Sequence, residues 1–208
     1  MAGTALIVLA GDVTKKDFET VSSWNLAVAV DAGMAHFLSF GLKPDILLGD
    51  FDSIQNSALE FAKSNNIEIV THPARKDKSD GELALEYVSQ NGFSRAILLG
   101  VNGGQRPDHI AFNLALFHLE QSLGLEIKAI SQGFEIFSVN GFKKIESKPD
   151  VNVSVMAFES DIHVKLSGLD YPLDGLLRRG STLGLSNVAL GDFTVETSGK
   201  ALVFVQRY

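Results

Sequence analysis

The sequence contains no cysteine among its 208 residues. Disulfides, thiolate metal ligands and cysteine nucleophiles are therefore excluded. Basic residues are also few, because 18 lysines and arginines stand against 25 acids and give a formal net charge of -7. This charge disfavours general nucleic-acid binding, since phosphate backbones attract basic surfaces. The lack of cysteine fits a reducing compartment, and we predict a cytoplasmic protein.

Long apolar runs are absent as well. No segment approaches the roughly 20 residues that a membrane helix needs, so we predict no membrane contact. The start of the chain lacks the basic segment of a signal peptide, and its apolar run over residues 5–9 is interpreted as a first strand. Two common phosphate-binding patterns, G-x-x-x-x-G-K-[ST] and G-x-G-x-x-G after a strand, are also missing.

The chain that is present divides into two parts of different character. Over residues 1–131, short apolar runs alternate with helical patterns, which predicts an α/β domain with a mostly parallel sheet flanked by helices. From about Gly133 helical periodicity is missing, and short strands are separated by Gly, Asp and Asn turns. Residues 132–208 are therefore predicted to form a smaller all-β, sandwich-like domain. The helix after the fifth strand is expected over residues 109–123.

Acidic side chains follow the predicted strands of the first part. Asp50 and Asp52 come directly after the apolar run 46–48, and Asp31, Asp77, Asp80 and Asp108 follow other strands. The carboxyl ends of parallel strands meet at one edge of a sheet, where ligands of open α/β sheets bind. Carboxylate oxygens suit a hard divalent cation. Lys76, Lys78 and Arg106 lie among the acids, so the edge is suited to binding phosphate.

Other interpretations of these residues stay open. An Asp or Ser just before a helix often serves only as a cap, and a charge run such as that at Lys76 is often a solvated surface. A strand that ends in D-x-D is also typical of phosphatases in which an aspartate, here Asp50, is the nucleophile. Four of the five histidines, His36, His72, His118 and His163, have no metal-ligand spacing and are interpreted as structural.

The ordered set of motifs resembles the thiamine pyrophosphokinase family. That family's pattern G-D-x-D-S, K-D-x-T-D and G-G-R-x-D-H is matched by Gly49-Asp50-Phe51-Asp52-Ser53, Lys76-Asp77-Lys78-Ser79-Asp80 and Arg106-Pro107-Asp108-His109. Asp31-Ala32-Gly33 resembles the family's D-G-G element, and Ser79 keeps the hydroxyl of the usual threonine. In the second half, segments 168–173 and 185–187 resemble the family's thiamine-domain segments.

The resemblance implies an enzyme that transfers a pyrophosphoryl group from ATP to thiamine and yields thiamine diphosphate and AMP. It implies Mg²⁺ held by Asp50, Asp52 and Asp80, with Asp77 and Arg106 also in the catalytic set. It implies a homodimer with active sites at the subunit interface. It further implies two sets of ligand-binding residues, which are Asp31, Lys76, Arg106, Asp108, His109 and Asn113 for ATP, and Tyr171, Ser186 and Asn187 for thiamine.

Two rival functions make different predictions. A phosphatase or phosphotransferase that uses Asp50 as nucleophile would form a covalent phosphate and no AMP. A non-catalytic nucleotide- or thiamine-binding module would bind its ligand without turnover. The kinase interpretation predicts AMP formation that depends on both Mg²⁺ and thiamine.

Overall fold

The chain forms two compact units, Met1–Gln132 and Gly133–Tyr208, each with its own hydrophobic core. The computed structural model describes residues 3–52, 54, 56–73, 77–104 and 106–208. We call Met1–Gln132 the α/β unit and Gly133–Tyr208 the β unit. Among the described residues, no helix is long and apolar enough to cross a membrane. The parallel α/β sheet followed by an antiparallel β region confirms the predicted fold class.

The α/β unit contains a parallel sheet in the order β6-β5-β1-β2-β3-β4. Its strands are β1 (Thr4–Val8), β2 (Leu26–Val30), β3 (Ile46–Gly49), β4 (Glu68–Thr71), β5 (Arg95–Leu99) and β6 (Glu126–Ser131). β1 and β3 are buried along their whole length, as expected for strands covered on both faces, whereas β4 is partly exposed. Strands buried on both faces need no polar residues, so continuous apolar runs in the sequence predict these central strands.

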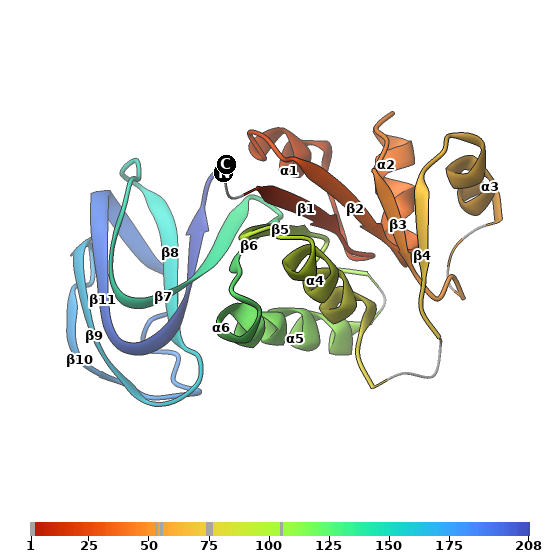
Figure 1. Cartoon of the computed structure of the whole chain (residues 1–208). Coiled ribbons are helices and arrows are strands. Elements are labelled where there is room, and N and C mark those ends of the chain that lie inside the picture. The colour runs from red at the N-terminus through yellow and green to blue at the C-terminus, as the bar shows by residue number, and fades with distance from the viewer. Residues whose placement is uncertain (1–2, 53, 55, 74–76, 105) are drawn as a thin grey trace. The chain divides into compact units, whose positions relative to one another are not determined.

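Helices cover both faces of this sheet (Figure 1). They are α1 (Lys15–Thr20), α2 (Met34–Ser39), α3 (Asn56–Ser64), α4 (Asp80–Gln90), α5 (Pro107–Ala115) and α6 (Glu120–Leu123), with 3₁₀ turns η1 (Asp31–Gly33) and η2 (Leu116–Leu119). From β1 to β4 the chain moves in one direction with α1, α2 and α3 on one face. It then returns to the other side of β1, and α4, α5 and α6 cover the opposite face. Right-handed crossovers require this change of face when the direction reverses.

The expected single helix over residues 109–123 is wrong in its bounds. α5 begins earlier, at Pro107, whose fixed φ and missing N–H suit the first turn of a helix. η2 follows, and α6 ends at Gly124, which has the left-handed φ of 62° common at helix ends. The pattern of apolar residues fixes the existence of the helix better than its ends.

The β unit consists of β7 (Phe134–Ile145), β8 (Val151–Ala157), β9 (Ile162–Leu169), β10 (Leu173–Leu177) and β11 (Asn187–Gln206). β11 pairs antiparallel with β7 and β9, β9 pairs antiparallel with β10, and β8 runs parallel to β11. The alternation expected in β9 is confirmed, because Ile162, Val164 and Leu166 are buried.

The β unit departs from the expected short strands. The apolar segments around Phe193 and Ala201 belong to one strand, β11, whose register shifts between Thr197 and Ala201. Residues Thr194–Thr197, before the shift, pair with β9, whereas Ala201–Val205, after the shift, pair with β8, as Asn187–Ala189 at the start of the strand also do. A bulge of this kind bends a strand so that it can join two layers, and its polar residues Ser198, Gly199 and Lys200 look like a turn in the sequence.

Candidate active site

A cavity of about 640 Å³ lies at the point where the strand order of the α/β unit reverses. β1 is the first strand, and its neighbours β2 and β5 carry the chain away in opposite directions, so the loops after β1 and β5 diverge and leave a crevice. The lining residues are Leu9, Ala10, Gly11, Val30, Asp31, Ala32, Ser79, Asp80, Gly81, Val101, Gly103, Gly104, Arg106, His109 and Asn113.

Five of the residues predicted for the site line this cavity. They are Asp31, Asp80, Arg106, His109 and Asn113. They come from the segments that follow β2, β4 and β5, namely η1, the start of α4, and Arg106 with α5. These segments are far apart in the sequence and meet because the strands are parallel. The Asn113 side chain also donates from Nδ2 to the Val101 carbonyl oxygen (3.0 Å), which ties α5 to the cavity wall.

The N-termini of α4 and α5 both border the cavity. Ser79 caps α4, where its hydroxyl accepts the Glu82 N–H (3.2 Å), and Asp80 and Gly81 follow in the first turn. α5 begins after Arg106 without a side-chain cap from the described residues. Backbone N–H groups at a helix N-terminus attract anions, because they carry unpaired donors and the positive end of the helix dipole.

Arg106 forms a bidentate ion pair with Asp108 in the first turn of α5. Its Nε and Nη2 donate to the two carboxylate oxygens at 2.9 and 2.6 Å. The hydrogen bond to Arg106 lowers the pKa of Asp108 to about 2, and the same bond raises the pKa of Arg106. The Arg106 side chain is 65% exposed and the Asp108 side chain is 50% exposed, so the guanidinium remains within reach of a ligand in the cavity.

The segment Gly49-Asp50-Phe51-Asp52, which we call the acid loop, begins at the last residue of β3. Within the described part of the chain, Asp50 and Asp52 are not among the residues that line the cavity. The Asp52 N–H donates to Asp50 Oδ1 (3.1 Å), and the Phe51 N–H donates to Oδ1 of the buried Asp31 (3.1 Å). Asp31 therefore connects the acid loop to the cavity wall.

A magnesium ion suits the donors at this edge, because Asp50, Asp52 and Asp80 offer the oxygen ligands that the hard cation prefers. Among the residues that the structure describes, no three carboxylate or imidazole side chains already gather as a metal site. The donor set thus fits the ion in chemistry, and binding would have to draw these side chains together. Asp77 is exposed, and Lys76 lies outside the described residues.

The neighbouring basic residue Lys78 points to α4 and forms an ion pair with Glu86. This hydrogen bond raises the pKa of Lys78. Because its charge is paired with Glu86, we assign Lys78 no ligand.

Sequence reasoning missed the contacts that shape the glycine-rich wall. Asp12, after β1, accepts the Gly104 N–H at Oδ1 (3.2 Å), and its own N–H donates to the Asn102 carbonyl oxygen (2.7 Å). A Cβ at Gly11 would lie 2.2 Å from that same Asn102 oxygen, and one at Gly103 would lie 2.2 Å from Asp12 Cγ. Gly11 is therefore needed for the close approach of two backbones, and Gly103 for the close approach of the Asp12 side chain, requirements that only the three-dimensional contacts reveal.

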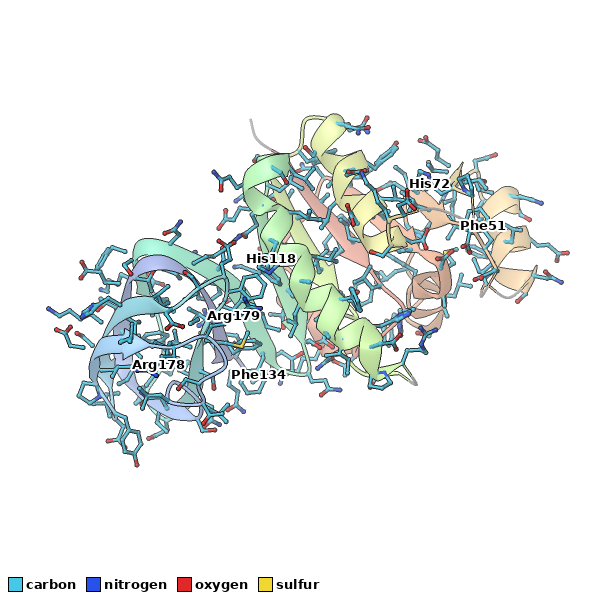
Figure 2. The ribbon with its side chains drawn as sticks, turned by 90° about the horizontal axis from the view of Figure 1, so that it is seen from below. Phe51, His72, His118, Phe134, Arg178 and Arg179 are labelled. Atoms are coloured by element: carbon cyan, nitrogen blue, oxygen red, sulfur yellow. The ribbon has the colours of Figure 1, made fainter. Side chains whose placement is uncertain are left out.

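His72, which the sequence analysis interprets as structural, lies just after β4. Its N–H donates to the Gly49 carbonyl oxygen (2.9 Å), which extends the pairing of β4 with β3 to the start of the acid loop. Its ring Nε2 is buried and has no hydrogen-bond partner among the described residues. Figure 2 shows His72 and Phe51 in the same corner of the α/β unit.

In the β unit, the three residues predicted for thiamine lie at the ends of two strands. The Tyr171 side chain is 67% exposed. Asn187 is buried, accepts the Tyr171 N–H (3.0 Å) at Oδ1 and donates from Nδ2 to the Tyr171 carbonyl oxygen (2.6 Å). Ser186 has a left-handed φ of 60°, and its N–H donates to Ser154 Oγ (3.0 Å). Asn187 thus holds the backbone that carries Tyr171.

The fold and the cavity define an α/β protein with a cavity at the switch point of its sheet, bordered by the N-termini of α4 and α5. Comparison with known proteins makes this more specific, because residues 18–129 match the family model for the thiamin pyrophosphokinase catalytic domain. The chain belongs to the thiamine pyrophosphokinase family, as its motifs indicated.

Individual relatives agree with this assignment. A thiamine pyrophosphokinase of Bacillus subtilis (strain 168) is 28% identical over 166 residues, which cover 78% of this chain and 77% of the relative. The crystal structure of thiamine pyrophosphokinase from Bacillus subtilis has a TM-score of 0.85 at 27% identity, over 98% of this chain and 99% of that one. Thiamin pyrophosphokinase from Candida albicans, at 14% identity, shares the fold with a TM-score of 0.86 over 100% of this chain and 90% of its own.

Proposed function

We propose that the protein is a thiamine diphosphokinase. The hydroxyl oxygen of thiamine attacks the β-phosphorus of ATP, the bond from that phosphorus to the oxygen bridging the α-phosphate breaks, and AMP leaves. The hydroxyl proton passes to a base at the site. The observation that carries this proposal is a cavity at the switch point of the sheet that combines two helix N-termini, Arg106 and the acids Asp31 and Asp80.

The phosphate groups of ATP fit the side of the cavity formed by α4 and α5. The N–H groups at the start of both helices would donate to phosphate oxygens. Arg106 would stabilise the charge that develops on the transferred group, since a guanidinium binds phosphate in a bidentate manner. Asp108 holds this guanidinium in the free protein. Lys76, which lies outside the described residues, is proposed to assist in the same role.

The acids of the edge are proposed to hold Mg²⁺ through Asp50, Asp52 and Asp80, with Asp77 supporting them. When bound, the ion would neutralise phosphate charge and orient the transferred group for in-line attack. The nucleoside would lie against α5, where His109 and Asn113 line the cavity. Asp108 shapes this side through its pair with Arg106.

The thiamine site is proposed to involve the β unit. The exposed ring of Tyr171 offers an aromatic face to the cationic thiazolium, and Ser186 offers a hydroxyl for the aminopyrimidine. The Asn187 side chain already bonds the Tyr171 backbone through both of its polar atoms. Its proposed role is to orient Tyr171 rather than to contact thiamine.

A homodimer is part of the proposal. The β unit exposes large apolar side chains that a partner could cover, namely Phe142, Leu176, Leu183, Leu185 and Leu190. Exposed apolar surface of this kind is typical of protein interfaces. Sedimentation equilibrium would test this, and a monomer at micromolar concentration would contradict it.

The deciding experiment incubates purified protein with ATP, thiamine and Mg²⁺ and separates the products. Formation of thiamine diphosphate and AMP in equal amounts, dependent on all three components, is expected. Inorganic phosphate without AMP, together with a covalent phosphate on Asp50, would favour the phosphatase alternative. Binding of ATP or thiamine without any product would favour a non-catalytic module.

A further inference from the structure

We propose that Asp31 is a positioning residue, which acts by holding the acid loop in shape rather than by contacting ATP. The inference rests on the proposed function only for the role of Asp50 and Asp52. Its structural part concerns Asp31, Gly49 and Phe51, which lie at the ends of the neighbouring strands β2 and β3 or directly after them.

The first observation is the backbone of Phe51. This residue has a φ of 64°, in the left-handed region that non-glycine residues seldom adopt. Its N–H donates to Oδ1 of Asp31 at 3.1 Å. Phe51 also packs against the core of the α/β unit. The conformation turns the chain so that Asp50 and Asp52 flank a side chain that is anchored in the core, and strained backbone of this kind needs support from its surroundings.

The second observation is the fit of Asp31 against Gly49. Asp31 is only 9% exposed and has itself a left-handed φ of 46°. A Cβ at Gly49 would lie 1.8 Å from Asp31 Oδ1, far inside contact distance. The same Gly49 is fixed from its other side, because its carbonyl oxygen accepts the His72 N–H (2.9 Å). The glycine therefore makes room for the carboxylate that supports the turn.

Together these contacts explain why a buried carboxylate lies between the cavity and the acid loop. The close approach of Gly49 and the bond to the Phe51 N–H direct Oδ1 of Asp31 at the loop. The loop in turn determines the direction of Asp50 and Asp52.

The test compares Asp31→Ala, Asp31→Asn and Gly49→Ala. Asp31→Asn keeps an oxygen that accepts the Phe51 N–H but loses the charge, whereas Gly49→Ala keeps every acid and displaces Asp31. Hydrogen exchange of the Phe51 amide, followed by NMR, reports the loop directly. Titration of Mn²⁺ into the protein, followed by EPR, measures the metal affinity of the acids. Neither measurement requires turnover. Gly175→Ala is the matched control, because a Cβ there meets nothing within 4 Å.

We expect the Phe51 amide to exchange at least about tenfold faster, and Mn²⁺ affinity to fall at least about tenfold, in Asp31→Ala and Gly49→Ala. Asp31→Asn should stay within about threefold of the wild type in both readouts. An Asp31→Asn variant as impaired as Asp31→Ala would overturn the proposal, because charge would then be the essential property. Unchanged Phe51 exchange in Gly49→Ala would overturn it as well.

A double variant keeps the test decisive if Asp31→Ala folds poorly alone. Glycine adopts a positive φ without strain, so Phe51→Gly should make Asp31 less necessary. In the Phe51→Gly background, Asp31→Ala is expected to change Mn²⁺ affinity by less than about threefold. A full tenfold loss in that background would mean that Asp31 acts independently of the turn. Because these readouts use the free protein, a failure here differs from the absence of thiamine diphosphate formation.

Discussion

The α/β unit and the β unit place their polar side chains by different rules. In the α/β unit every loop after a strand reaches the same edge, so Asp31, Asp80 and Arg106 meet although they are spread over 75 residues of sequence, from position 31 to position 106. In the β unit the position of Tyr171 depends on two hydrogen bonds to Asn187 and on the register of β9 and β11. In the α/β unit, the order of strands and loops along the chain suffices to predict where the polar side chains lie. In the β unit, the pairing of the strands must also be known.

This difference predicts where substitutions act. Changes at exposed residues of the α/β edge should alter turnover without affecting stability, because these side chains lie in loops after the strands and outside the core. Changes in the loops of the β unit should alter the use of thiamine, and some should also alter stability because the same side chains hold the loops together.

The largest effect is expected for Asp52→Asn. Asp52 is exposed, so removing its charge should leave the fold intact but remove a metal ligand. We expect kcat to fall by about a thousandfold, with Tm within about 2 °C of the wild type. Steady-state assays of AMP formation and a thermal melt measure the two quantities.

The matched control is Glu60→Gln, an exposed acid on α3 in the same unit. It should change neither kcat nor Tm. Turnover in Asp52→Asn that equals that of Glu60→Gln would remove Asp52 from the proposed metal site.

Much of the candidate site follows from the sequence for this topological reason. Asp31, Asp80, Arg106 and His109 were predicted at strand ends and line the cavity, as does Asn113, which only the family resemblance indicated. A strand-end residue in a parallel sheet needs only its strand to be recognised, and apolar runs such as that of β3 are easily recognised.

The remaining features depend on backbone geometry that leaves little trace in the sequence. Asp12 looks like an ordinary turn residue, yet it anchors the glycine-rich wall through the Gly104 N–H. Gly103 is needed because Asp12 lies where its side chain would be. Such contacts join loops that are about 90 residues apart in the sequence, with a separation of 92 for Asp12 and Gly104. The single long strand β11 was missed because its register shift has the composition of a turn.

A smaller effect, confined to one substrate, is expected in the β unit for Tyr171→Ala. The exposed ring is proposed to lie against the cationic thiamine, and a cation–π contact of this kind corresponds to about tenfold in binding. The KM for thiamine should rise by this factor, while the KM for ATP should stay within about twofold. Tyr171→Phe keeps the aromatic face and should behave like the wild type. Equal changes in both KM values would argue against an aromatic platform for thiamine.

Asn187→Ala should have a mixed effect, because Asn187 is buried and bonds to the backbone of Tyr171. Loss of these hydrogen bonds is expected to lower the free energy of unfolding by about 1–2 kcal/mol, and chemical denaturation measures it. The KM for thiamine should rise less than in Tyr171→Ala. Asn152→Ala is the control. Asn152 is exposed, and its side chain donates a hydrogen bond to another side chain, that of Gln206, rather than to backbone. A larger rise in thiamine KM than in Tyr171→Ala would indicate direct contact between Asn187 and thiamine.

The smallest effect concerns two exposed carboxylates, one in each unit. The hydrogen bond from Arg106 lowers the pKa of Asp108 from 3.8 to about 2, and the hydrogen bond from Lys144 lowers the pKa of Asp192 in the β unit. A lowered pKa in the folded state means that each pair contributes stability above the ordinary pKa. For Asp108 this contribution is lost as the pH falls from 3.8 toward about 2. An NMR titration of the Asp108 carboxyl carbon should show the low midpoint, and Arg106→Gln should move the midpoint back up toward 3.8.

The two carboxylates, Asp108 and Asp192, should also respond differently to ATP. At neutral pH its phosphates should compete with Asp108 for Arg106, because Arg106 lines the cavity. The carboxyl signal of Asp108 should therefore shift when ATP is added, while the signal of Asp192 should stay in place because Lys144 pairs with it in the other unit. Equal shifts at both positions would mean that ATP perturbs exposed ion pairs in general, and an unshifted Asp108 would place the phosphates away from Arg106.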